Sequence, residues 1–119
     1  MTLRLWTVEI DCHDPRTLGH WWADILHWKV FYEEDDHVVV TTPDERFPGL
    51  AFSRVPEGKS VKNRLHLDFA PDDQDAEVER LIRLGARRVD VGQGDAGWVV
   101  LADPEGNEFC ILGTREGGM

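Results

Sequence analysis

Seven polar residues of this chain have side-chain types and spacings that could perform chemistry. They fall on three segments in which polar and apolar residues alternate, and they are Thr7, Glu9, Arg64, His66, Asp68, Glu108 and Cys110. Because successive side chains of a strand point to opposite faces, the polar members of each segment share one face. If the segments form strands, this alternation gathers imidazole, carboxylate, guanidinium and thiol groups on one side of a sheet.

His66 is the predicted proton-transfer residue, because an imidazole titrates near neutral pH and can move a proton without a metal. We expect Glu9 or Asp68 to orient this ring, and we predict His66 and Glu9 as the catalytic residues. The alternative interpretation is a pocket histidine that is hydrogen-bonded to Asp68, to Glu9 or to a water molecule.

The predicted substrate-binding residues are Thr7, Arg64, Asp68, Glu108 and Cys110. Cys110 acts as a nucleophile only if a basic neighbour such as His66 lowers its pKa. We favour the other interpretation of Cys110, a small apolar residue. Arg64 fits a carboxylate or phosphate of a ligand, and it could equally pair with Asp68 or Glu9.

The elements that must position these residues come in the same order twice. In the first half, Asp14-Pro15 predicts a helix start, because Asp is a good N-cap and Pro fits the first helical position. The apolar residues that follow it recur at helical spacing: Leu18, Trp21, Trp22, Ile25 and Leu26. Strands are expected before and after this helix, at 3–12, 28–34, 37–42 and 49–55.

The second half repeats this order. Strands are expected at 64–70, 86–91, 98–102 and 108–112, with a helix that starts near Pro71 and ends at Gly85. Segment 38–40 with Pro43-Asp44 matches segment 99–101 with Pro104-Glu105 at a constant offset. The chain is therefore predicted to contain two β-α-β-β-β modules.

This repeat predicts an α+β fold in which two βαβββ modules form a curved, mostly antiparallel sheet around a concave cavity, with the helices outside. We expect a single domain over residues 1–119, divided into module one (1–55), a linker (56–63), module two (64–113) and a tail (114–119). The apolar face beneath the helices would carry Val8, Ile10, Leu65, Leu67, Phe69, Phe109 and Ile111. Trp6 is expected on that helix side as well.

Composition narrows the possible partners. The formal net charge of −10 argues against nucleic acid and against anionic membrane, since both require a basic surface. No apolar run is long enough for a membrane span and the N-terminus lacks an export signal, so we expect a cytoplasmic protein. The two cysteines are expected to be reduced and mostly buried.

The chain resembles the vicinal-oxygen-chelate superfamily, which includes glyoxalase I, bleomycin-resistance proteins, fosfomycin-modifying enzymes and extradiol dioxygenases. The resemblance rests on the doubled module and on three motifs: Asp11-Cys12-His13-Asp14-Pro15 before a helix with Trp21-Trp22, Arg64-Leu65-His66-Leu67-Asp68, and Asp103-Pro104-Glu105-Gly106-Asn107-Glu108-Phe109. The most similar branch is the glyoxalase-like one.

The resemblance implies a divalent metal held by the first and last strands of each module. His66 matches one such position, whereas Thr7 stands at the corresponding position of the first module and Cys110 stands where a Glu is usual. The fourth position lies near Ala51 or Ser53. We therefore predict no metal ligands and no cofactor. The alternative is a divalent metal near His66, such as zinc bound through His66 and Cys110.

The resulting hypothesis is a glyoxalase-like protein that binds a small organic molecule in its concave cavity, by sequestration or by acid/base chemistry at His66. The first alternative is a divalent-metal-dependent lyase, isomerase or dioxygenase of the glyoxalase type. The second alternative is a non-catalytic structural or interaction module. The resemblance also implies a homodimer.

Overall fold

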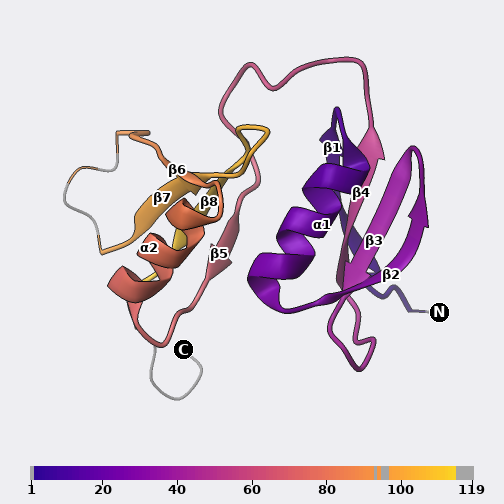
Figure 1. Cartoon of the computed structure of the whole chain (residues 1–119), viewed down its shortest axis with the longest axis horizontal. Helices are drawn as coiled ribbons and strands as arrows, with labels where there is room; N and C mark the ends of the chain where they lie inside the picture. Colours follow the sequence, from indigo (N-terminus) through magenta and orange to yellow (C-terminus); the bar gives the residue numbers. More distant parts are fainter. Residues whose placement is uncertain (1, 93, 95–96, 115–119) are drawn as a thin grey trace. The chain divides into compact units, whose positions relative to one another are not determined.

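The computed structural model describes residues 2–92, 94 and 97–114 and divides the chain into two compact units at Gly58 and Lys59 (Figure 1). This division lies within the segment 56–63 that the sequence marks as a linker. Each unit is described here by itself, and the shared concave cavity stays a prediction. No helix in the described part of the chain is both long and apolar enough to cross a membrane.

Unit 1 is a four-stranded mixed sheet with one helix. Its elements, in chain order, are β1 (Thr7–Cys12), α1 (Pro15–Leu26), β2 (Lys29–Glu34), β3 (His37–Thr41) and β4 (Gly49–Arg54). The strand order is β1-β4-β3-β2, in which β1 is parallel to β4 and the other pairs are antiparallel. The strand β4 therefore lies between β1 and β3.

The helix α1 starts where the sequence predicts. The carboxylate of Asp14 accepts hydrogen bonds from the backbone N–H of Thr17 (3.1 Å) and from its hydroxyl (2.8 Å), which hold the pKa of Asp14 below its ordinary value. Gly19 lies against the sheet, where an added Cβ would come within 2.7 Å of Val38 Cγ1. Because Val38 and Phe52 lie next to Gly19, the residues that alternate with them face away from α1.

Unit 2 repeats the arrangement with shorter strands. Its elements are β5 (Leu67–Phe69), α2 (Gln74–Arg83), β6 (Arg87–Arg88), β7 (Val99–Ala102) and β8 (Glu108–Ile111). The strand order is β5-β8-β7-β6, and β5 is parallel to β8. Asp73 caps α2 by accepting from the N–H of Ala76 at 3.1 Å, as Asp14 does for α1. The α+β class and the doubled β-α-β-β-β order are thus confirmed.

The turn between β7 and β8 is built around Asp103, which is fully buried. Its Oδ1 accepts from the backbone N–H groups of Glu105 and Asn107, each at 2.9 Å, and the Asn107 side-chain amide donates to the same carboxyl group. Gly106 has a φ of 92°, which a residue with a side chain rarely adopts. This turn fixes where β8 begins and so which of its side chains face the site.

The registers identify equivalent positions in the two units. Ala51 of β4 lies between Glu9 and Val39, and Cys110 of β8 lies between Asp68 and Val100. Val39 and Val100 already match in the sequence repeat. Ala51 therefore corresponds to Cys110, and Glu9 corresponds to Asp68.

Two apolar residues lie outside their predicted positions. Leu65 was expected beneath the helix but is 89% exposed, because β5 begins only at Leu67. Trp6 was expected on the helix side but precedes β1, where its half-exposed ring stacks on Phe47 at 3.9 Å. The predicted burial of the cysteines is confirmed, since Cys12 and Cys110 are both buried and neither forms a disulfide. The predicted loop at 93–97 and the tail lie largely outside the described residues.

Candidate functional site

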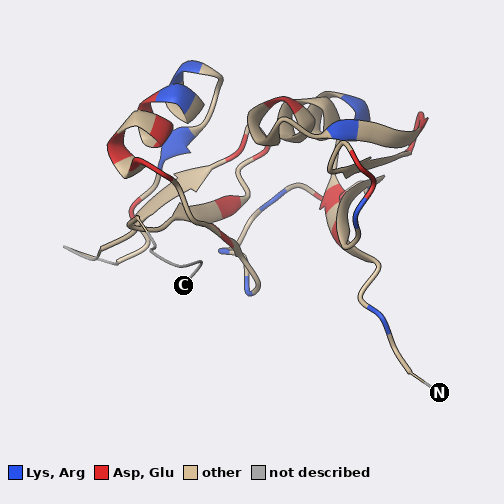
Figure 2. Ribbon diagram, turned by 90° about the horizontal axis from the view of Figure 1, so that it is seen from below, with Lys and Arg blue, Asp and Glu red and all other residues tan. Residues whose placement is uncertain are grey.

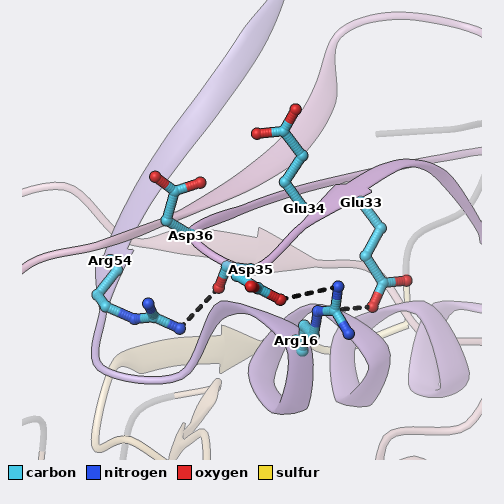
Figure 3. A pocket seen from close by; sticks show the side chains of 6 residues that line it. All are labelled: Arg16, Glu33, Glu34, Asp35, Asp36 and Arg54. Atoms are coloured by element: carbon cyan, nitrogen blue, oxygen red, sulfur yellow. Dashed lines mark hydrogen bonds and ion pairs between the residues drawn. The ribbon is translucent and has the colours of Figure 1, made fainter.

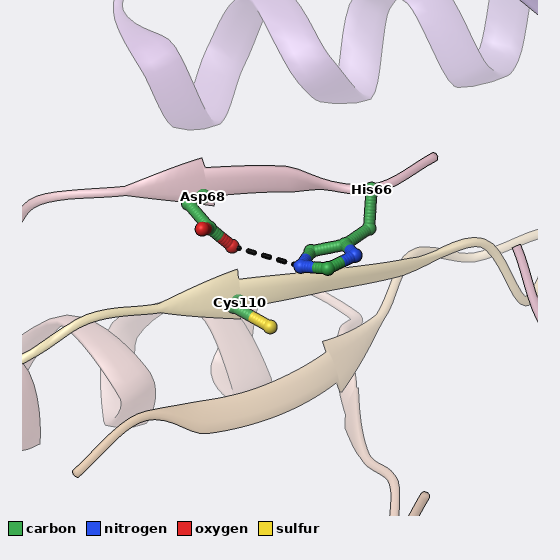
Figure 4. Close-up of side chains that lie close together, drawn as sticks. All are labelled: His66, Asp68 and Cys110. Carbon is green, nitrogen blue, oxygen red and sulfur yellow. Dashed lines mark ion pairs between the residues drawn. The ribbon is translucent and has the colours of Figure 1, made fainter. Parts of the chain in front are cut away.

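His66, Asp68 and Cys110 come together on one face of unit 2 (Figure 4). Asp68 lies directly opposite Cys110 across the parallel pair β5 and β8, and His66 precedes Asp68 by two positions. The His66 Nε2 atom lies 3.1 Å from Asp68 Oδ1. One nitrogen, oxygen or sulfur atom from each residue lies within 4.8 Å of the others. Alternation therefore placed these three predicted site residues correctly on one face.

The surroundings of Cys110 favour the protonated thiol. Burial raises the pKa of Cys110, and the charge of Asp68 and a hydrogen bond to it raise the pKa further, whereas the Lys62 ammonium lowers it by a smaller amount. His66 lies 3.1 Å from Asp68 and is not among the causes of this pKa shift. These surroundings disfavour the interpretation of Cys110 as a nucleophile.

Glu108 binds the segment that leads into unit 2. Its carboxylate accepts from the Asn63 N–H (2.9 Å) and pairs with Lys59 Nζ (3.0 Å), while its side chain is only 12% exposed. Burial raises the pKa of Glu108, but the Asn63 N–H and the Lys59 ammonium outweigh burial and hold the pKa below its ordinary value. The predicted substrate-binding role of Glu108 stays a prediction, because the contacts seen in the structure are made to the chain itself.

Glu9 belongs to a second cluster, in unit 1. Its Oε1 accepts a hydrogen bond from Ser53 Oγ at 2.7 Å, and its Oε2 lies 3.4 Å from His37 Nε2. Because β4 separates β1 from β3, Glu9 and His37 must meet over β4, whose Ser53 lies opposite His37. The predicted pairing of Glu9 with His66 stays a prediction, and the partners that the structure shows are Ser53 and His37.

Among the described residues, no side-chain hydrogen bond of the two remaining predicted residues, Thr7 and Arg64, is seen. Thr7 is half-buried at the start of β1, and Arg64 is exposed ahead of β5. Sequence reasoning missed His37 as a partner of Glu9. The alternation of segment 37–42 puts the side chains of His37 and Val38 on different faces of the sheet. Only the sheet order shows that the His37 side chain lies over β4.

Unit 1 also carries an open depression of about 580 Å³, beside the turn between β2 and β3 (Figure 3). It is lined only by charged residues, namely Arg16, Glu33, Glu34, Asp35, Asp36 and Arg54. Arg16 pairs with Asp35 at 3.0 Å and with Glu33 at 3.4 Å. The ion pairs fasten the turn to the start of α1, so we interpret the depression as a structural feature.

The donor set of the unit 2 cluster suits a borderline metal such as zinc. Imidazole nitrogen and thiolate sulfur are good zinc ligands, and a carboxylate oxygen is an acceptable third. His66, Asp68 and Cys110 supply one of each within 4.8 Å of one another. A closed tetrahedral site has four protein donors, and this set has three. Three protein donors leave one position open, as in metal sites that also bind a substrate or water.

The two units share the βαβββ order of a glyoxalase-like fold, and the second unit brings His66, Asp68 and Cys110 together. The model of the glyoxalase-like domain matches residues 7–112. The chain therefore belongs to the glyoxalase-like domain family. Among curated proteins, none matches the chain.

Solved structures share this fold at low sequence identity. A glyoxalase/bleomycin resistance protein/dioxygenase family enzyme from Burkholderia phytofirmans is 18% identical, with a TM-score of 0.73 over 95% of this chain and 100% of its own. The bleomycin-binding protein of Streptomyces verticillus, solved with copper(II)-bleomycin, is 20% identical (TM-score 0.62; 97% and 100% covered). The trypanothione-dependent glyoxalase I of Leishmania major is 15% identical (TM-score 0.67; 94% and 87% covered). These similarities show the fold.

Proposed function

We propose that this glyoxalase-like protein binds a small organic molecule beside His66 and that the His66–Asp68 pair accepts a proton from it. The observation that carries the proposal is the 3.1 Å contact between His66 Nε2 and Asp68 Oδ1. Both side chains remain accessible, with 39% of His66 and 47% of Asp68 exposed. A bound molecule can therefore reach the imidazole while the carboxylate holds it.

The contact also bears on which ring atom acts as the base. The tautomer with its proton on Nε2, the nitrogen that lies beside Asp68, carries its free lone pair on Nδ1. We assign to Nδ1 the proton taken from the ligand, and the nearby Asp68 carboxylate stabilises the imidazolium that forms. Arg64, exposed two positions earlier, is proposed to contact an anionic group of the ligand.

A ligand screen with a matched control tests this proposal. A library of small metabolites is screened by ligand-observed NMR against the wild type, His66→Ala and His20→Ala. His20 is the control because its Nε2 lies 3.0 Å from Glu33 Oε1, an equally close His-carboxylate pair between α1 and β2. Binding should be lost in His66→Ala and retained in His20→Ala. A ligand that binds His66→Ala as tightly as the wild type, or a library without any ligand, would refute the proposal.

The same spectra distinguish the two forms of the function. New product signals that appear with time indicate turnover, and unchanged ligand signals indicate sequestration. For turnover, the rate should rise with pH, because only a neutral imidazole is a base. A rate that does not vary with pH would remove the acid/base role but not binding.

A second candidate function is that of a divalent-metal-dependent glyoxalase-type enzyme, which the three converging donors favour. His66, Asp68 and Cys110 would hold the ion, and a bound ion would supply Lewis-acid polarisation of a ligand oxygen. Elemental analysis of protein prepared without chelator, followed by titration with cobalt(II), tests this candidate. Cobalt should give thiolate absorption in the wild type and none in Cys110→Ala. Absence of uptake at saturating cobalt would end it.

A further inference from the structure

The segment 59–64 that leads into unit 2 is cationic in an acidic chain. It holds Lys59, Lys62 and Arg64 and no acidic residue, whereas the whole chain has 13 basic and 23 acidic residues (Figure 2). Positive charge beside a site raises the local concentration of anions there. The cationic segment is therefore relevant to the charge of the ligand that the site binds.

Glu108 holds this segment beside the His66 cluster. Its carboxylate binds Lys59 Nζ and the Asn63 N–H, and the Asn63 amide side chain donates to the Glu108 carbonyl oxygen at 3.4 Å. Glu108 and Cys110 point to the same side of β8, about 6.8 Å apart along the strand. The backbone next to Lys62 is therefore fixed close to Cys110.

The two ammonium groups of this segment differ in how they are compensated. Lys59 is neutralised by Glu108. In the described part of the chain, the Lys62 ammonium forms no ion pair, and its hydrogen bond is to the carbonyl oxygen of Asn63 at 3.4 Å. Asn63, the neighbour of Lys62 in the chain, is bound to Glu108, so this ammonium group belongs to the part of the segment that is held against β8.

We infer that the ligand of the His66 site is a small organic anion and that Lys62 is the residue that selects it. The inference rests on the function proposed above, in which Arg64 contacts an anionic group, and it adds the charge of the ligand as a whole, a carboxylate or a phosphate, and the role of Lys62. Asp68 is the carboxylate beside the proposed ligand, and it lies 3.1 Å from His66. Among the described residues neither Lys62 nor Arg64 has an ion-pair partner, so both supply positive charge next to His66 in the chain.

Cys110 is a built-in reporter of this charge. Two methanethiosulfonate reagents of similar size are compared, one carrying a sulfonatoethyl group and one a trimethylammonioethyl group. In each reaction a disulfide forms between Cys110 Sγ and the reagent sulfur, the S–SO₂ bond breaks, methanesulfinate leaves and the thiol proton passes to solvent. Mass spectrometry of peptides separates the Cys110 adduct from any adduct at Cys12, the second cysteine.

Lys62→Gln should lower the ratio of the anionic to the cationic rate at Cys110 by about fivefold, because the reagents differ by two charges within a Debye length of the ammonium. The effect should shrink at high salt. Arg83→Gln, which removes an exposed charge of α2, should leave the ratio unchanged. Ligands found in the library screen should be anions that bind Lys62→Gln more weakly than the wild type.

The outcomes separate this inference from the proposed function. An unchanged ratio in Lys62→Gln, with Cys110 still reactive, overturns the anion inference and leaves ligand binding at His66 intact. A neutral ligand that binds the wild type and Lys62→Gln equally well has the same meaning. If neither reagent modifies Cys110, the buried thiol is closed to these reagents, and the ligand screen decides the inference: an anion that binds the wild type and Lys62→Gln equally well overturns it.

Discussion

Replacement of Glu108 by Ala removes the carboxylate that fastens segment 59–63 to β8. Two donors lose their acceptor, the Asn63 N–H at 2.9 Å and Lys59 Nζ at 3.0 Å. The side chains of Glu108 and Lys59 are only 12% and 21% exposed, so water compensates the loss poorly. A hydrogen bond to a charged group contributes about 1.5–3 kcal/mol, and we expect Glu108→Ala to lower the free energy of unfolding by about 2–3 kcal/mol.

Urea denaturation measures this change, and amide hydrogen exchange locates it. The Asn63 amide should be protected in the wild type and exchange rapidly in Glu108→Ala. Glu108→Gln keeps an acceptor for Asn63 but loses the charge, so its cost should be about 1 kcal/mol. Glu79→Ala, at an exposed position of α2, is the control and should change neither quantity. An Asn63 amide that exchanges equally fast in all four proteins would refute the fastening.

The sign of the pH dependence follows from the lowered pKa of Glu108. A carboxyl group with a pKa lower in the folded than in the unfolded state stabilises the fold fully above its unfolded pKa of about 4.3. This stabilisation is lost as pH falls through the folded-state pKa. Glu108→Gln should therefore lose less stability than the wild type on acidification. Parallel acid titrations of the two proteins would contradict this reasoning.

Three further substitutions test the packing and caps that position the site, each by thermal melting with circular dichroism. Asp103→Ala leaves the buried turn donors, including those of Asn107, without an acceptor and should cost about 3 kcal/mol; a cost below 1 kcal/mol would be inconsistent with the turn. Gly19→Ala forces a Cβ against Val38 and should cost about 1–3 kcal/mol, unless the sheet yields. Asp14→Ala removes the cap of α1 and should cost about 1 kcal/mol, with an unchanged melting temperature as the contrary result.

The order of elements was predictable because its signals are local. Asp14 and Asp73 each precede a helix and cap it, and alternation marks the strands that follow. Strand ends were less predictable, because pairing decides them. Leu65 continues the alternation of its segment, yet β5 pairs with β8 only from Leu67 to Phe69. The sequence does not show how far a partner strand extends, and the predicted strand was therefore too long.

The site was predictable in unit 2 and less so in unit 1 for the same reason. His66 and Asp68 are two positions apart, and this spacing alone predicts that their side chains lie on the same side of the chain. The motif that resembles the superfamily includes both residues. The contact of Glu9 with His37 depends on β4 lying between β1 and β3, which is a long-range feature of the sheet. Alternation gives the face of each residue, but only sheet order gives its neighbours.

The equivalent residues Glu9 and Asp68 lie in different surroundings. Both carboxylates lie beside an imidazole, but Glu9 reaches His37 of β3, whereas the ring beside Asp68 is that of His66, which precedes β5. In unit 1 the contact crosses β4, where Ser53 lies opposite His37 and donates a hydrogen bond to Glu9. In unit 2 the contact lies beside Cys110, which is the counterpart of Ala51. The two clusters therefore differ because one histidine is part of its sheet and the other precedes its strand.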